Sequence, residues 1–209
     1  MAQTAEGDVL FFIPDISGYT KFVAETEIKH SQHIIKMLLE GLVDANALGL
    51  TVSEFEGDAV LFYRTGSPPA LKDFIEQART MFVGFHATLQ KIERMRECQC
   101  GACAGASGLT LKIVAHAGPA SPLQLKDQLK FIGTGVIVAH RLLKNSVPER
   151  EYLLLSGSLV GPADAAGAEV AELLSGTDSY DELGAVAYRY LPLTKYREEV
   201  KIAPLDPAA

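Results

Sequence analysis

The pattern of hydrophobic positions starts with a short apolar run at residues 9–13, VLFFI, which leads at once into PDISG at 14–18 and then a helical pattern. A buried strand that ends in an acid before a glycine turn is a place where a ligand can be held. The carboxylate of Asp15 suits a cation, and free N–H groups at the start of the predicted helix suit an anion. Those N–H groups belong to Ser17, Gly18, Tyr19 and Thr20. A simpler interpretation, in which Asp15 or Ser17 caps the helix, is favoured on this stretch alone.

Helical spacing of apolar residues recurs along the chain and predicts helices at residues 17–24, 27–48, 68–95 and 133–145. Between them, runs rich in branched and aromatic residues predict strands. These strands are a hairpin at 50–64 folded about Glu56-Gly57, single strands at 109–117, 129–132 and 152–155, and a final antiparallel pair at 169–174 and 184–193 around a polar turn. Gly118-Pro119 is expected to end the strand at 109–117.

This order of elements predicts an α+β fold with helices on one face of a mixed sheet. The sequence has no internal repeat and no linker, and its 209 residues are enough for one full hydrophobic core. We therefore expect a single domain over residues 1–209, with the core at about 8–193 and a loose tail at 203–209.

Composition narrows the classes of partner. Hydrophobic residues make up 48% of the chain and charged residues 22%, which is typical of a soluble globular protein. The net charge of −7 argues against a nucleic acid or an anionic membrane as the partner. The polar start of the sequence and its short first apolar run argue against a signal peptide and a membrane span. We therefore expect a cytoplasmic protein.

Three cysteines are packed into the segment CQCGAC, at Cys98, Cys100 and Cys103. An odd number of cysteines at this spacing does not resemble a secreted disulfide framework. Their density is compatible with Zn²⁺, but a structural zinc site normally has four ligands and His86 is only a remote candidate for the fourth. A zinc site and three reduced cysteines in a loop both stay open, with the second slightly favoured.

Four segments, in the same order along the chain, resemble the catalytic domain of the class III nucleotidyl cyclase family. FIPDISGYTKF is similar to the family's first metal-binding strand and turn, and SEFEGDAVLFY to its second metal hairpin. LKIVAHAGPA is similar to the strand that follows, and FIGTGVIVAHRLLKN to the helix with the family's Asn and Arg. The resemblance covers roughly residues 8–160, and the CxCxxC insertion points to a divergent bacterial branch.

The resemblance implies a ferredoxin-like βαββαβ core, with a mixed, mostly antiparallel sheet and helices packed on it. It also implies cyclisation of a nucleoside triphosphate, in which the 3′ oxygen attacks the α-phosphorus and pyrophosphate leaves. Two divalent ions assist that reaction in the family. Asp15 and Asp58 would hold Mg²⁺ or Mn²⁺, with the Ile16 carbonyl as a further ligand. The family places this site at the interface of a head-to-tail homodimer.

The position that selects the base departs from the adenylyl cyclase pattern. Four residues before Asp58 the chain has Glu54, the residue type of guanylyl cyclases, and its partner position is Lys130. A carboxylate can accept hydrogen bonds from the N1–H and N2–H₂ groups of guanine, which adenine does not offer. The other interpretation is a plain ion pair that reads no base. In either case we expect Glu54 and Lys130 to lie within ion-pair distance.

The helix at 133–145 keeps Arg141 but has Ile137 in place of the family's Asn. Arg141 would neutralise charge on the phosphate in the transition state, whereas Ile137 cannot hydrogen-bond a ribose. His140, beside Arg141, could face phosphate, but a position on the surface is favoured, and His116 is expected in a structural role. The sequence thus predicts a domain that binds a purine nucleoside triphosphate and a divalent cation, with weak or absent turnover. An active adenylate or guanylate cyclase and a non-catalytic signalling module are the alternatives.

Overall fold

The computed structural model describes residues 7–94, 105–160 and 172–201. The described strands form one sheet in the order β2-β3-β1-β4-β6-β8-β7, and β5 pairs with the far part of β4. Of the pairings between described strands, β4 with β6 is parallel and the others are antiparallel. The elements are β1 (Gly7–Ser17), α1 (Tyr19–Ala24), α2 (Ile28–Asp44), β2 (Thr51–Glu56), β3 (Ala59–Thr65), α3 (Leu71–Arg94), η1 (Ala106–Gly108), β4 (Thr110–Leu125), β5 (Gln128–Ile132), α5 (Thr134–Leu142), β6 (Tyr152–Ser156), β7 (Leu174–Tyr180), β8 (Gly184–Pro192) and η3 (Thr194–Glu199).

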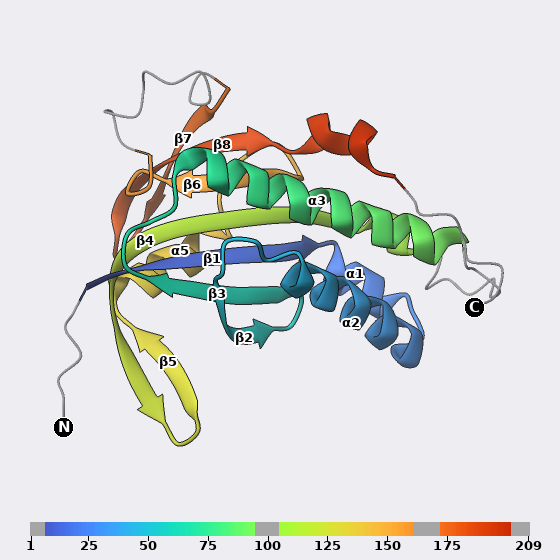
Figure 1. Cartoon of the computed structure of the whole chain (residues 1–209), viewed down its shortest axis with the longest axis horizontal. Coiled ribbons are helices and arrows are strands. Elements are labelled where there is room, and N and C mark those ends of the chain that lie inside the picture. The colour runs from blue at the N-terminus through green and yellow to red at the C-terminus, as the bar shows by residue number, and fades with distance from the viewer. Residues whose placement is uncertain (1–6, 95–104, 161–171, 202–209) are drawn as a thin grey trace.

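Helices cover both faces of this sheet, so the expectation that they lie on one face was wrong. Side chains alternate across a strand, and alternate residues of β1 belong to two different apolar clusters. Leu10 and Phe12 pack with α2 and α3. Phe11 and Ile13 pack with Ala139 of α5. Figure 1 shows α3 in front of the sheet and α5 behind it. We refer to these two surfaces as the α3 face and the α5 face.

The α3 face holds the larger core because two long amphipathic helices cover it. Helix α3 buries a stripe of apolar residues with helical spacing, among them Phe74, Phe82 and Phe85. Helix α2 contributes Leu38 and Leu42, which are almost fully buried. None of the helices in the described ranges is both long and apolar enough to cross a membrane.

Strand β4 does not end at Gly118-Pro119, contrary to expectation. Pro119 still pairs with Asp8 of β1, and the strand then leaves the main sheet to pair with β5. Figure 1 shows this β4–β5 hairpin as an arm that extends beyond the sheet. Phe131 of β5 fixes the base of the arm, because its ring meets Phe11 edge-on at 5.7 Å and Tyr63 at 4.6 Å between centroids.

Two glycines allow α5 to pack directly on the backbone of β4. A Cβ atom at Gly135 would lie 2.6 Å from the carbonyl oxygen of Gly118. A Cβ atom at Gly118 would in turn lie 3.0 Å from the Cα of Gly135. Neither position can take a side chain without moving the helix. This contact sets the height of α5 above the strands that it covers.

The final strand pair is only partly as predicted. Strand β8 matches the predicted strand at 184–193, but its partner β7 covers Leu174–Tyr180, the stretch expected to be a polar turn. Residues 169–171 of the strand expected at 169–174 lie outside the described residues. Strand β7 is an edge strand with mostly exposed side chains. It therefore lacks the apolar alternation from which a strand is predicted.

A hydrogen-bonded triad ties η3 to the sheet and α3; His86 and Glu151 are buried, and Arg197 is exposed. The Glu151 carboxylate accepts a bond from His86 Nε2 at 2.7 Å and one from Arg197 Nη2 at 2.7 Å. Arg197 Nη1 also donates to His86 Nδ1 at 3.0 Å, so Nε2 carries the imidazole proton. Burial alone would raise the pKa of Glu151, but the bonds from His86 and Arg197 outweigh it and hold that pKa below its ordinary value.

We expect Glu151→Gln to lower the free energy of unfolding by roughly 2 to 3 kcal/mol, because it leaves the groups facing it without a charged acceptor. The control is Glu198→Gln, which removes the same charge at an exposed position of η3. Urea denaturation at neutral pH measures both variants. The stabilisation by Glu151 is present above the pKa of the unfolded carboxyl and is lost as the pH falls through the lowered pKa of the folded state. Equal stability of the two variants would contradict the role of the triad.

Candidate functional site

Asp15 and Asp58 come together at one end of the α5 face. Asp15 lies near the end of β1, directly opposite Ala59 of β3, and Asp58 is the turn residue just before Ala59. The Ile16 N–H donates to the Asp58 carbonyl oxygen at 3.1 Å, which holds the turn against β1. Gly57 has φ of 68°, a conformation that favours glycine and that forms the tip of the hairpin. The hairpin predicted about Glu56-Gly57 is therefore present, and its turn lies against the part of β1 that carries Asp15.

Burial acts on both carboxylates, and the charge of Asp58 also acts on Asp15. Burial raises the pKa of Asp15, with a further increase from the charge of Asp58, and Lys112 opposes both effects. Burial likewise raises the pKa of Asp58 above its ordinary value, against the Asp58 backbone hydrogen bond and then Lys112. Two neighbouring acids with raised pKa values favour a bound cation, because a cation stabilises the ionised form of each.

The donor set fits a hard divalent cation that is shared with a substrate. In the described parts of the chain no three or more His, Cys, Asp or Glu side chains gather at one point as a metal site would require. Asp15 and Asp58 therefore offer two carboxylates, with the Ile16 carbonyl as a predicted third ligand. Mg²⁺ commonly binds proteins through one or two carboxylates, with water and substrate phosphates as the remaining ligands. The two acids suit that kind of site and not a closed structural one.

Glu54 and Lys130 form the expected ion pair within one chain. Lys130 Nζ on the arm donates to Glu54 Oε2 on β2, and both side chains are about 30% exposed, 29% and 31%. A groove of about 560 Å³ lies beside this pair, between β2 and the tip of the arm. Ser53, Tyr63 and Gln128 are among the residues that line it. The groove has polar and aromatic walls next to a charge pair, which are the features that recognise a planar polar ring.

His140 was expected on the surface; its side chain keeps 36% exposure and also makes a contact that was not predicted. It is half-buried, and its Nε2 lies 3.0 and 2.9 Å from the two carboxylate oxygens of Glu56. Its Nδ1 lies 2.8 Å from the Val136 carbonyl oxygen. The Glu56 carboxylate, as the first cause, raises the pKa of His140 above its ordinary value. The pair connects α5 to β2, two residues from Asp58.

Ile137 and Arg141 lie one helical turn apart on α5 and are both exposed, Ile137 to 48%. Arg141 acts electrostatically on Tyr180 of β7, which is at the opposite edge of the sheet from β2. Arg141 is thus close enough to β7 for its charge to act on Tyr180 within the same chain. Its role in neutralising phosphate charge stays a prediction.

At residues 17–20, where an anion site was predicted, the helix starts later than expected. Helix α1 begins at Tyr19 and not at Ser17, which is still paired with Thr110 in the sheet. Gly18 precedes the helix with φ of 90°, and a Cβ there would lie 3.3 Å from the Gly108 carbonyl oxygen. Helix α1 has only six residues. Binding of phosphate by Ser17, Gly18, Tyr19 and Thr20 stays a prediction.

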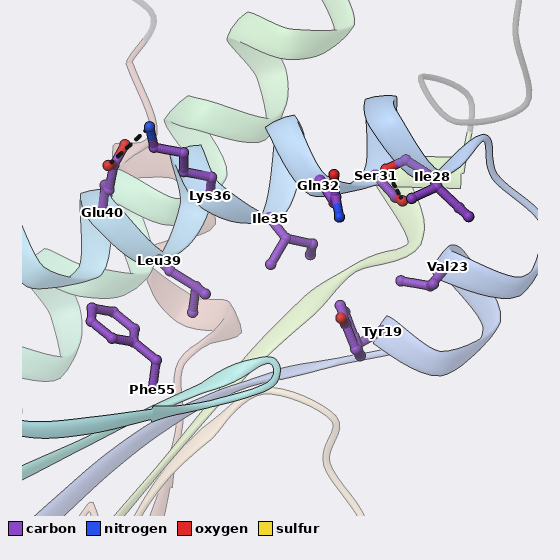
Figure 2. A pocket seen from close by; sticks show the side chains of 10 residues that line it. All are labelled: Tyr19, Val23, Ile28, Ser31, Gln32, Ile35, Lys36, Leu39, Glu40 and Phe55. Carbon is purple, nitrogen blue, oxygen red and sulfur yellow. Dashed lines mark hydrogen bonds and ion pairs between the residues drawn. The ribbon is translucent and has the colours of Figure 1, made fainter.

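The side chain of Tyr19 instead lines an apolar groove of about 440 Å³ on the α3 face. Figure 2 shows Tyr19 and Phe55 below α2, facing Ile35 and Leu39. Phe55 pairs with Val60, whose side chain belongs to the α3 face. The groove therefore lies on the opposite side of the sheet from Asp15, and it is separate from the acid pair.

The remaining candidates do not join this site. Cys98, Cys100 and Cys103 lie outside the described residues. His86, the remote fourth zinc ligand, is instead bonded to Glu151 in the core. His116 bonds Ser156 Oγ at 2.8 Å, and burial lowers its pKa to about 4, so it is a neutral core residue as predicted.

Sequence reasoning missed two residues of the site, Lys112 and Glu56. Lys112 Nζ lies 3.6 Å from Asp15 Oδ2, because the two residues are directly paired across β4 and β1. Glu56 was treated only as part of a turn, although it is two residues from Glu54 on the same strand and so shares its face. Glu56 could have been found from the sequence, because side chains two residues apart on a strand lie on the same face. Lys112 could be found only once the register between β1 and β4 was known.

Sequence comparisons relate the chain to proteins whose activity is not described. The model of the family "Protein of unknown function (DUF2652)" matches residues 35–152. The uncharacterised protein Rv2561/Rv2562 of Mycobacterium tuberculosis (strain ATCC 25618 / H37Rv) is 30% identical over 156 residues, which are 75% of this chain and 72% of that protein.

Solved structures of nucleotidyl cyclase domains share the fold. The guanylate cyclase domain of RhGC from Catenaria anguillulae, solved in complex with GTP, has a TM-score of 0.58 at 21% identity, covering 90% of this chain and 97% of that one. A bacterial light-regulated adenylyl cyclase has a TM-score of 0.59 at 15% identity, covering 95% of this chain and 100% of that one. The predicted α+β fold of the nucleotidyl cyclase type is thereby confirmed.

The ion pair of His140 and Glu56 should make stability depend on pH. A histidine with a raised pKa stabilises the fold fully below its unfolded value of 6.5, and the stabilisation is lost as the pH rises through the folded value. We expect wild type to exceed His140→Gln by about 1 kcal/mol or less at pH 5.5, since the pair is partly exposed, and the gap to close by pH 9. Denaturation across this pH range measures it, with exposed His33→Gln as the control. A gap that does not change with pH would contradict the charged pair.

Proposed function

The chain belongs to the DUF2652 family, described as proteins of unknown function, and we propose that it binds a purine nucleoside triphosphate with a divalent cation at Asp15 and Asp58. One observation carries the proposal: the fold of a nucleotidyl cyclase domain places two half-buried acids side by side on the α5 face. Their raised pKa values reflect a place where negative charge is crowded and partly removed from water. A divalent cation is the natural partner of such a pair.

The cation would be Mg²⁺ or Mn²⁺, and when bound it would neutralise the triphosphate and polarise its phosphorus–oxygen bonds. The residues of the chain then have separate tasks. Asp15 and Asp58 would hold the cation, and Ile16 would add its carbonyl oxygen as a ligand. The backbone N–H groups of residues 17–20 lie directly after Ile16 in the sequence and would donate to phosphate oxygens.

The purine would lie in the groove beside Glu54 and Lys130. A carboxylate acceptor and an ammonium donor in one pair offer both kinds of partner to the edge of a base. Because the two side chains neutralise each other in the free protein, the base has to replace part of that ion pair. This competition weakens the discrimination between bases. We therefore expect the site to bind a purine and to select only modestly between ATP and GTP.

The complete site would require two copies of the chain. Arg141 and Ile137 are exposed on α5, and within the chain the charge of Arg141 acts on Tyr180 of β7. In a head-to-tail homodimer, Arg141 of one copy would face the triphosphate held by Asp15 and Asp58 of the other. The solvent-exposed apolar side chain of Ile137 would lie at the same interface.

We infer weak or absent cyclase turnover, because Ile137 offers no hydrogen bond at a position where a polar side chain would orient the ribose. The loss of one such group typically costs about two to three powers of ten in rate. A second candidate function is a non-catalytic signalling module. The observation that favours it is that Glu54, Glu56 and Asp15 each have a basic neighbour in their own chain.

Binding can be tested by titrating the protein with a fluorescent GTP analogue in the presence of Mn²⁺. We expect saturable binding by wild type and a loss of at least tenfold in affinity for Asp58→Asn, which removes one carboxylate from the cation. The control is Asp181→Asn, because Asp181 is likewise an acid in a hairpin turn, at an exposed position between β7 and β8. Equal affinity of the two variants, or no binding by wild type, would count against the proposed function and would favour the signalling module.

Turnover can be tested by incubating wild type and Ile137→Asn with Mn²⁺ and either ATP or GTP, with products separated by chromatography. We expect little cyclic nucleotide from wild type and a rise of at least tenfold for Ile137→Asn, because the amide restores an orienting hydrogen bond. Asp58→Ala should abolish any product. Rapid cyclic-nucleotide production by wild type would show that the chain does not need a polar group at position 137.

A further inference from the structure

Lys112 is a built-in cation beside the acid pair. It lies on β4 directly opposite Asp15, and its Nζ is 3.6 Å from Asp15 Oδ2. Its charge also acts on Asp58, whose pKa it lowers against the effect of burial. The side chains of Lys112 and Asp15 are both largely buried, with 19% and 17% of their surface exposed to solvent. Water therefore screens their interaction less than it screens an exposed ion pair.

The ammonium group is held in place by a second contact. Lys112 Nζ donates to the Leu143 carbonyl oxygen at 2.9 Å. Leu143 directly follows α5, so this carbonyl is at the negative end of the helix dipole. The tether fixes a flexible lysine side chain beside the acids. It also connects the acid pair to the helix that carries Arg141.

This arrangement changes the charge that a divalent cation meets. With both acids ionised, two negative charges and the one positive charge of Lys112 leave a net charge of −1. A divalent cation shared by the two carboxylates would lie within a few ångströms of the ammonium group. At such distances, in a partly desolvated site, the repulsion between the two cations is strong.

We propose that Lys112 sets the cation affinity of the acid pair, so that a divalent cation alone binds weakly and enters together with the triphosphate. Beside Lys112, the two acids provide too little negative charge and too few ligands to hold the cation alone. The negative oxygens of the triphosphate supply both. This inference rests on the proposed function and extends it, because it assigns to one residue the coupling between cation and nucleotide. Lys112 is a positioning residue and does not act on the reacting atoms.

The test measures Mn²⁺ binding to the full chain without nucleotide, by electron paramagnetic resonance of free Mn²⁺ at pH 7.5. We expect Lys112→Met to lower the dissociation constant for Mn²⁺ at least tenfold, because the repulsive charge is gone. Lys112→Arg keeps the charge and should stay within about twofold of wild type. Lys144→Met is the matched control, since it removes the same charge from an exposed lysine directly after Leu143. Circular dichroism verifies folding, and Lys112→Gln replaces Lys112→Met if the latter does not fold.

A second titration includes a non-hydrolysable GTP analogue. In wild type the analogue should raise the affinity for Mn²⁺ at least tenfold, and in Lys112→Met the increase should be clearly smaller. Asp15→Asn is made both in wild type and in Lys112→Met. If Lys112→Met binds Mn²⁺ no better than wild type while Asp15→Asn removes binding in both backgrounds, the inference is overturned and the cation site stands. If no variant binds Mn²⁺ with or without the analogue, both the inference and the proposed function are overturned.

Discussion

Carboxylates crowded on the α5 face are the constraint around which this part of the molecule is built. Asp15, Glu54, Glu56 and Asp58 come from two strands and one turn, and like charges this close are costly without compensation. The compensating groups come from three other elements, β4, β5 and α5. The Lys130–Glu54 and His140–Glu56 pairs therefore also fix the arm and α5 against β2, and the Lys112–Asp15 pair links β4 to β1. The contacts that neutralise the acids are therefore also contacts that place the arm and α5.

The two faces of the sheet have different roles: the α3 face holds most of the apolar core, and the α5 face holds the candidate site. On the α3 face, α2 and α3 cover an apolar core that includes Phe12 and Leu191, and the hydrogen-bonded side chains of His86 and Glu151 are buried with it. The α5 face has two smaller apolar clusters and carries the charged groups. Because the core on the α3 face does not depend on those charges, the acid pair can retain raised pKa values and an exchangeable partner. Residues that bind ligands are often less stabilising than the groups that could replace them.

Local chemistry made much of the fold predictable, and long-range register accounts for what was missed. The hairpin around Gly57 and its acids follow from alternation and a glycine with positive φ. Strand β7 could not be predicted, because an edge strand buries almost nothing. The position of His140 against Glu56 depends on where α5 crosses the sheet, and that is set by the backbone contact at Gly118 and Gly135. Lys112 meets Asp15 only through the pairing of β1 with β4, which no pattern within either strand specifies.

The most direct test of the account is to locate the cation itself. Crystals of the protein grown with Mn²⁺ and a non-hydrolysable GTP analogue would be measured at the manganese absorption edge. The account predicts an anomalous peak within coordination distance of the carboxylates of both Asp15 and Asp58, with the triphosphate on the same peak. A crystal with ordered nucleotide whose manganese lies elsewhere, or an acid pair occupied only by Lys112 at saturating Mn²⁺ and nucleotide, would contradict it.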